Sequence, residues 1–255
     1  MKILAINGSH SGDKGRTRFL IDRLFEGAVK AGAECEVITL ATLKINRCLA
    51  CGHCQTESHR FQCVYDGKDD AEIIFQKMRE SDLIVYATPI YIFTLSGLFK
   101  TFIDRIHATG NVSDLRLSES GLVFHHIDRS LCSKPFVGLI CCDNLETETP
   151  KNAISYFKTF SKFMDAPLAG LLVRNAGGLA KMAERPGSGI TLPKLKEVYE
   201  AYKQAGQELA TEGRIQRSTE KKANQEIAPV PMFGLLKRMP FKSLKRQFVD
   251  RARKM

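Results

Sequence analysis

Short apolar runs alternate with segments of helical periodicity along this chain, and this alternation is the feature that most constrains its fold. Residues 2–6 (KILAI) and 82–88 (DLIVYAT) suit strands that are buried on both faces of a sheet. Between such runs, apolar residues recur at helical spacing, as Phe19, Leu20 and Leu24 do. Strands that alternate with helices predict an α/β fold with a parallel sheet.

The same patterns predict five strands and five helices over residues 1–210. We expect the strands over 2–6, 35–40, 82–88, 135–142 and 168–173, and the helices over 17–31, 69–80, 97–108, 150–164 and 192–210. Residues 44–68 are predicted to be a long irregular insertion, and 111–133 a polar connection. We therefore expect one domain over residues 1–210 and an extension over 211–255.

The formal charge of +10 is concentrated in this extension. Residues 211–255 hold twelve Lys and Arg against four Asp and Glu, whereas the first 210 residues hold 26 against 24. A nearly neutral body does not favour nucleic acid as a partner. Apolar residues of the extension are interleaved with Lys and Arg, which favours a helix docked on the body or on a second subunit; an anionic membrane surface is the alternative. These residues are Leu235, Leu236, Met239, Phe241, Leu244 and Phe248.

The sequence also bears on cellular location. No apolar run approaches the roughly 18 residues of a membrane-spanning helix, so we expect no transmembrane segment. The first residues lack the features of a secretory signal, and we therefore expect a cytoplasmic protein.

Four of the eight cysteines form a tandem cluster at Cys48, Cys51, Cys54 and Cys63. Because cytosolic proteins rarely keep structural disulfides, the cluster indicates a metal or redox site. Thiolates suit both iron–sulfur clusters and zinc, for which His53 or His59 could substitute as a ligand. Free or reversibly paired thiols are a third interpretation. Three other cysteines, Cys35, Cys132 and Cys141, are expected to be small core residues.

Two loops that follow predicted strands have the composition of ligand sites. Residues 7–17 (NGSHSGDKGRT) lead into a helix, and their glycines and hydroxyls suit a phosphate; the alternative is a loop that only turns. They match neither the dinucleotide nor the triphosphate motif. The second loop places four consecutive apolar residues, 90–93, after a strand. A planar aromatic cofactor would cover them; the alternatives are packing under neighbouring loops and a dimer contact.

The segment 88–105 (TPIYIFTLSGLFKTFIDR), taken with the first loop, resembles the NADPH-dependent FMN reductase family of flavodoxin-like proteins over about residues 1–175. The cysteine insertion is similar to that of the iron–sulfur flavoprotein branch of this family. The resemblance implies a three-layer sandwich around a five-stranded parallel sheet of order 2-1-3-4-5, with FMN across the carboxyl ends of the strands.

The resemblance also implies three groups of FMN contacts. The phosphate would lie near Ser9, Ser11, Arg16 and Thr17. The isoalloxazine would lie against Pro89, Ile90, Tyr91, Ile92 and Phe93, and its far edge would meet Cys142, Asp143 and Asn144. Arg16 stands where the family commonly has a small polar residue.

The implied function is an FMN-dependent oxidoreductase that passes electrons from NAD(P)H or a ferredoxin-type donor to an acceptor, through a [4Fe–4S] cluster on Cys48, Cys51, Cys54 and Cys63. We expect no catalytic side chain because the flavin carries the chemistry. The alternatives are an electron carrier without a substrate site and a non-redox zinc-binding module. The resemblance also implies a homodimer or homotetramer.

Overall fold

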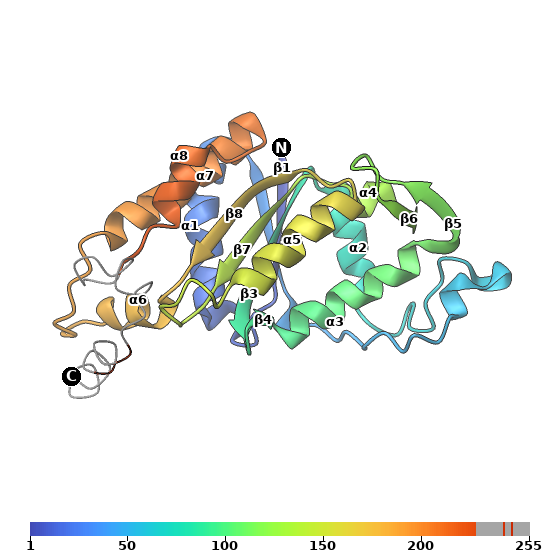
Figure 1. Cartoon of the computed structure of the whole chain (residues 1–255), viewed down its shortest axis with the longest axis horizontal. Helices are drawn as coiled ribbons and strands as arrows, with labels where there is room; N and C mark the ends of the chain where they lie inside the picture. The colour runs from blue at the N-terminus through green and yellow to red at the C-terminus, as the bar shows by residue number, and fades with distance from the viewer. Residues whose placement is uncertain (228–241, 243–245, 247–255) are drawn as a thin grey trace.

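Five parallel strands form the central sheet of the computed structural model, which describes residues 1–227, 242 and 246 (Figure 1). The strands are β1 (Lys2–Asn7), β2 (Glu34–Thr39), β3 (Leu83–Tyr91), β7 (Phe136–Cys141) and β8 (Leu168–Arg174). Their order across the sheet is β2-β1-β3-β7-β8, and each neighbouring pair is parallel. This is the predicted flavodoxin-like order, so the predicted fold class is confirmed.

Helices cover both faces of the sheet. Successive strand residues point to opposite faces, so that Ile3 and Ala5 belong to one apolar core and Leu4 and Ile6 to the other. The first core lies under α1 (Arg16–Lys30), α7 (Leu195–Glu212) and α8 (Arg217–Ala223), and the second under α2 (Ala71–Glu80), α3 (Gly97–Arg105) and α5 (Lys151–Phe163) (Figure 1). In the described part of the chain, no helix has the length and apolarity needed to cross a membrane.

Two glycines allow α1 and α7 to pack with their backbones in contact. A Cβ atom added at Gly27 would lie 1.7 Å from the carbonyl oxygen of Lys203, and one added at Gly206 would lie 1.8 Å from that of Leu24. Neither position has room for any other residue. This close approach brings α7, near the C-terminal end of the fold, onto α1.

The connection after α3 contains an antiparallel hairpin, which corrects the prediction of a polar connection over 111–133. The hairpin consists of β5 (Asn111–Leu117) and β6 (Val123–His126), and α4 (Arg129–Cys132) follows it. Its apolar side chains Leu115, Leu117 and Val123 are exposed. Because these residues face solvent, the sequence lacks the alternation of a half-buried strand that would have revealed the hairpin.

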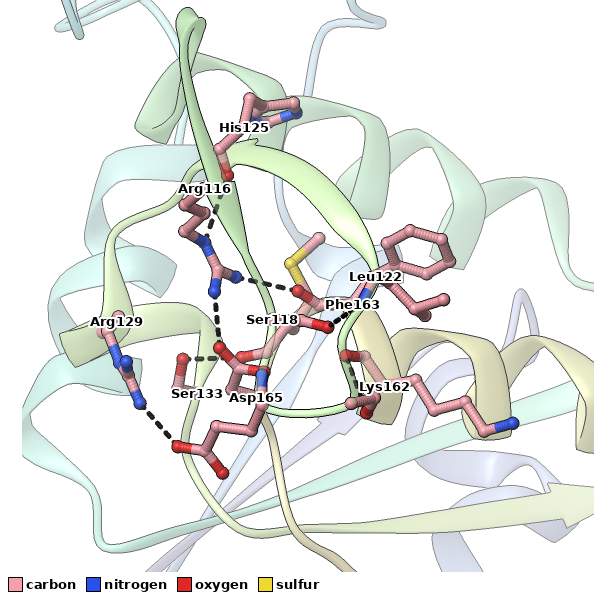
Figure 2. Close-up of polar contacts among 12 residues, drawn as sticks. Arg116, Ser118, Leu122, His125, Arg129, Ser133, Lys162, Phe163 and Asp165 are labelled. Atoms are coloured by element: carbon pink, nitrogen blue, oxygen red, sulfur yellow. Dashed lines mark hydrogen bonds and ion pairs between the residues drawn. The ribbon is translucent and has the colours of Figure 1, made fainter.

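Figure 2 shows how this hairpin is fastened beyond the end of α5. Arg116 on β5 donates to Asp165 Oδ2 at 2.5 Å and to the carbonyl oxygen of Phe163 at 2.8 Å. The backbone N–H of Glu119 donates to the other carboxylate oxygen at 2.8 Å. Burial raises the pKa of Asp165, but the hydrogen bonds from Glu119 and Arg116 outweigh it, so the pKa lies below its usual 3.8.

Residues 213–227 cover the outer edge of β8. Side chains of α8 replace a neighbouring strand: Glu220 accepts from the N–H of Leu171 at 3.0 Å, and Asn224 accepts from that of Val173 at 2.7 Å. An edge strand is thereby paired without exposing its backbone groups. The apolar residues over 235–248 lie outside the described residues, so the docking of this segment stays a prediction.

Candidate functional site

A cavity of about 160 Å³ lies at the carboxyl ends of β1, β3, β7 and β8. It is next to the point between β1 and β3 where the strand order reverses, which is where open α/β sheets bind ligands. Nine of the twelve residues that we predicted to hold FMN line it, and three do not. The nine are Ser9, Ser11, Arg16, Thr17, Pro89, Ile90, Tyr91, Cys142 and Asp143; the three are Ile92, Phe93 and Asn144.

The side chain of Asn7 holds the loop after β1 in shape. It donates to the carbonyl oxygen of Gly12 at 3.2 Å and accepts from the N–H of Ser9 at 3.2 Å. Gly12 has a φ of +56°, which glycine adopts without steric cost. Through this turn, the chain brings Ser9 and Thr17, both almost fully buried, to the same cavity wall.

The N-terminus of α1 adds backbone donors to this wall. The N-cap residue is Gly15, which has no side chain to cap the helix, and the first turn holds no acidic residue. A Cβ atom added at Gly15 would lie 2.8 Å from Ser9 Oγ, so the loop and the helix meet closely. Free N–H groups at the positive end of a helix, flanked by hydroxyls, suit an anionic group such as a phosphate.

Arg16 lines the same cavity but is held by a residue distant in sequence. Its two Nη atoms donate to the carboxylate of Glu184 at 2.5 and 2.9 Å, and it also contacts the hydroxyl of Tyr199. The Nε atom of Arg16 is buried, and within the described part of the chain it has no hydrogen-bond partner. A buried donor without a partner is costly, so an anionic oxygen in the cavity would satisfy it.

The second loop forms a tight turn at the end of β3. The short strand β4 (Thr94–Leu95) pairs back on β3, which leaves Ile92 and Phe93 as the two turn residues, with φ values of +46° and +65°. A β-branched residue such as Ile92 rarely adopts a positive φ, and such strain is typical of functional sites. The turn displays Ile92 at 88% and Phe93 at 61% exposure, just beyond Tyr91 in the cavity wall.

The ends of β7 and β8 supply residues that sequence reasoning missed. Cys141, predicted to be a core residue, is buried but also lines the cavity. Gly177, Gly178 and Lys181 come from α6 (Gly177–Ala183), a helix that was not predicted. A Cβ atom added at Gly177 would lie 3.1 Å from Cys141 Sγ, so a side chain there would crowd the cavity. The Gly-Gly pair after the last strand was the signal that could have revealed this wall.

Asn144 lies outside the cavity and is exposed. Its side-chain oxygen accepts from the N–H of Glu146 at 3.0 Å, and its carbonyl oxygen accepts from the N–H of Ala176 at 3.0 Å. It therefore shapes the turn after β7 rather than the cavity wall.

A second cavity gathers all four cysteines of the insertion. Cys48, Cys51, Cys54 and Cys63 line it together with Arg105. All four are free thiols, and burial raises the pKa of Cys54. The loop closes around the cavity through positive φ values at Ala50 and Gly52.

This second cavity encloses only about 20 Å³, which is room for a water-sized molecule. Among the described residues, no group of three or more His, Cys, Asp or Glu side chains is arranged to hold a single metal ion. His53 also lines the cavity, and its ring centroid is 4.1 Å from that of His59. The donor chemistry is that of a thiolate site, and the loop would have to widen to admit a metal group.

The sequence profile of the NADPH-dependent FMN reductase family matches residues 1–119. An iron–sulfur flavoprotein of Archaeoglobus fulgidus is 39% identical over 105 residues, which cover 41% of this chain and 48% of the relative. One of Methanocaldococcus jannaschii is 32% identical over 105 residues, which cover 41% and 51%. These findings confirm the resemblance to the reductase family and to its iron–sulfur flavoprotein branch.

The chain spans about half the length of the curated relatives it matches. Solved structures extend the similarity in fold beyond residues 1–119. An FMN-dependent NADH-azoreductase of Bacillus anthracis, in complex with FMN, has a TM-score of 0.58 at 14% identity and covers 83% of this chain and 100% of its own. A flavone reductase has a TM-score of 0.55 at 20% identity and covers 85% and 65%. At these identities the likeness concerns the fold alone.

Proposed function

We propose that this protein is an FMN-dependent oxidoreductase that takes electrons from NAD(P)H or a ferredoxin-type donor and passes them to an acceptor. The observation that carries the proposal is the cavity at the sheet's switch point. One end of it offers hydroxyls and the N-terminus of α1, and the other end opens onto the exposed turn at the end of β3. This combination of an anion site with an apolar surface matches the two ends of FMN.

The phosphate end of FMN would lie in the enclosed part of the cavity. Ser9 and Thr17 offer hydroxyls there, α1 offers backbone N–H groups, and Arg16 offers an unpartnered Nε–H. A volume of about 160 Å³ is below the usual range for an entire drug-sized ligand, so only part of FMN would be enclosed. The ring would then extend over Tyr91 and the exposed turn residues Ile92 and Phe93, as the sequence predicted.

We further propose that the cysteine cavity holds a [4Fe–4S] cluster. Four thiols on one wall are the ligand set that such clusters use. Bound FMN would supply one- or two-electron chemistry and the cluster one-electron chemistry. The chain's own residues bind and orient these groups. The sequence also allowed zinc in the cysteine cavity, and metal analysis distinguishes zinc from an iron–sulfur cluster.

The two cavities have no lining residue in common. The insertion runs below α3 toward the right-hand end of the view in Figure 1, whereas the FMN cavity lies at the ends of the central strands. The two cofactors can therefore be removed by separate substitutions. The homodimer or homotetramer that the resemblance implies stays a prediction.

The experiment that tests the FMN site compares FMN with riboflavin, which lacks the phosphate. We expect the chain to bind FMN more tightly, and Thr17→Val to remove this preference by weakening FMN alone. Tyr91→Asp should weaken both flavins by about tenfold, since it replaces an aromatic contact and adds a charge. Val123→Asp, which adds the same charge at an exposed apolar residue of the distant hairpin, is the matched control. Fluorescence titration measures the affinity of the unmodified chain and of each variant for both flavins.

Two outcomes contradict this placement. Equal binding of FMN and riboflavin by the unmodified chain would contradict the proposed phosphate site, and unchanged flavin binding by Tyr91→Asp would contradict the proposed ring site.

Anaerobic addition of NADPH distinguishes an enzyme from a passive electron carrier. An enzyme's flavin should be bleached by NADPH, whereas a carrier without a substrate site should keep its oxidised spectrum.

A further inference from the structure

Arg105 is a buried cation on the wall of the cysteine cavity. It lies at the end of α3, its side chain is 2% exposed, and it lines the cavity with the four cysteines. Its guanidinium also lies over the ring of Tyr65, 5.3 Å from the ring centroid. A fully buried arginine requires partners for its charge and for its five N–H donors.

Asp69 is the first of these partners, and it gives Arg105 a structural role. The two side chains form an ion pair in which the carboxylate is 1% exposed. Asp69 also accepts from the backbone N–H of Asn46 at 2.9 Å, and Arg105 donates to the carbonyl oxygen of the same residue at 3.1 Å. Asn46 and Asp69 stand at the two ends of the insertion, so this pair closes the insertion against α3.

The structural role does not satisfy the whole guanidinium. The Nε atom of Arg105 is buried and has no hydrogen-bond partner among the residues that the structure describes. Leaving such a donor unpaired at a buried position destabilises the fold. Burial lowers the pKa of Arg105, but Asp69 and the neighbouring Cys63 outweigh it, so the pKa is raised and the charge is kept.

We propose that Arg105 raises the reduction potential of the group held by the four cysteines, through its positive charge and a hydrogen bond to sulfur, and that Asp69 limits this effect. The inference rests on the proposed cluster site. Reduction moves one electron from an external reductant into the cavity and adds one negative charge there, while Arg105 itself keeps its bonds and its protons. A fixed cation at a buried site stabilises that added charge, and a fixed anion opposes it.

The test is a redox titration of the reconstituted full chain under anaerobic conditions, followed by electron paramagnetic resonance of the reduced cluster. Arg105→Gln removes the cation and should lower the equilibrium constant for reduction about tenfold, a shift of about 59 mV for one electron. Asp69→Asn removes the anion and should raise it. Arg105→Lys keeps the charge and should recover part of the loss.

Lys100→Gln is the matched control because it removes a cation from the same helix. Lys100 is exposed and paired with Asp104, so its removal should leave the potential unchanged. A purely structural role of Arg105 predicts that Arg105→Gln and Asp69→Asn both reduce the cluster content without opposite shifts, and this result would overturn the inference. If Arg105→Gln does not fold, the opposite displacements expected of Arg105→Lys and Asp69→Asn carry the same test.

The failure of this inference differs from the failure of the proposed function. A chain that takes up no iron and sulfide under any condition overturns the cluster site and the inference together. A chain that holds the cluster, but whose potential moves no further in the Arg105 and Asp69 variants than in Lys100→Gln, overturns the inference alone.

Discussion

At the scale of single residues, Ser96 couples the loop after β1 to the start of α3. Its hydroxyl accepts from the N–H of Phe99 at 3.1 Å as the helix N-cap and donates to the carbonyl oxygen of Gly8 at 2.6 Å. Ser96→Ala removes the cap and leaves a buried carbonyl unpaired, so we expect the free energy of unfolding to fall by about 1–3 kcal/mol. Urea unfolding measures the change.

Ser120→Ala is the control for this prediction, since Ser120 is exposed and makes only a 3.4 Å contact. It should change the free energy of unfolding by no more than about 0.5 kcal/mol. Equal stability of the two variants would contradict the proposal that the hydrogen bonds of Ser96 stabilise the contact between the loop after β1 and the start of α3.

At this scale, the sequence predicted candidate site residues where the signal was local. The cysteine spacing and the hydroxyls of the first loop are visible in short windows, and the structure brings each set to one cavity. Residues whose partners lie far away in the chain were out of reach. Arg16 meets Glu184 across the fold, and Arg105 meets Asp69 across the insertion.

At the scale of elements, the contact between α1 and α7 depends on glycine. Gly206→Ala would place a Cβ atom 1.8 Å from the carbonyl oxygen of Leu24, so the two helices must separate. We expect a loss of about 3 kcal/mol in the free energy of unfolding, since overpacking against backbone cannot be relieved by a side-chain rotation. Thermal or urea unfolding checks this value.

The matched change is Gly97→Ala at the start of α3, where an added Cβ atom meets nothing within 4 Å. Alanine favours helices over glycine, so this variant should be as stable as the parent or slightly more stable. If Gly206→Ala leaves the free energy of unfolding equally unchanged, the close backbone packing of α1 against α7 is contradicted.

The hairpin of β5 and β6 gives a prediction about pH. Because the pKa of Asp165 in the folded state lies below its usual 3.8, this carboxylate stabilises the fold above that pH, and the contribution is lost as the pH falls through the lower folded value. Asp165→Asn should cost about 2 kcal/mol near neutral pH and progressively less in acid. Asp114→Asn, on the exposed part of β5, is the control and should change neither the free energy of unfolding nor its pH dependence.

Urea midpoints at about pH 7 and about pH 3 test this prediction. A stability difference between Asp165→Asn and the parent that is the same at both pH values would contradict the prediction.

The hairpin itself shows why some elements escaped prediction. The buried strands and long helices have strong periodic patterns, whereas the exposed hairpin and the short α6 are held by contacts outside their own sequence.

At the scale of the whole molecule, the topology makes the candidate site. The strand order brings loops from β1, β3, β7 and β8 to one edge, although up to 172 residues separate Ser9 from Lys181 along the chain. The strands were predictable because a buried parallel sheet gives a strong sequence pattern, and their order because the segment 88–105 resembles a known family. The wall formed by α6 was missed, because its signal in the sequence is only the pair Gly177 and Gly178 after the last strand.

Metal and flavin analysis of the purified chain, after anaerobic reconstitution with FMN, iron and sulfide, is the decisive measurement for the two proposed cofactor sites. We expect a yellow-brown protein with about one FMN per chain and with iron and sulfide in the proportions of a [4Fe–4S] cluster. Replacing the four cysteines with serine should remove the iron and leave the FMN. A colourless protein that takes up no FMN would contradict the proposed FMN site, and a protein that holds zinc in place of iron would contradict the proposed cluster.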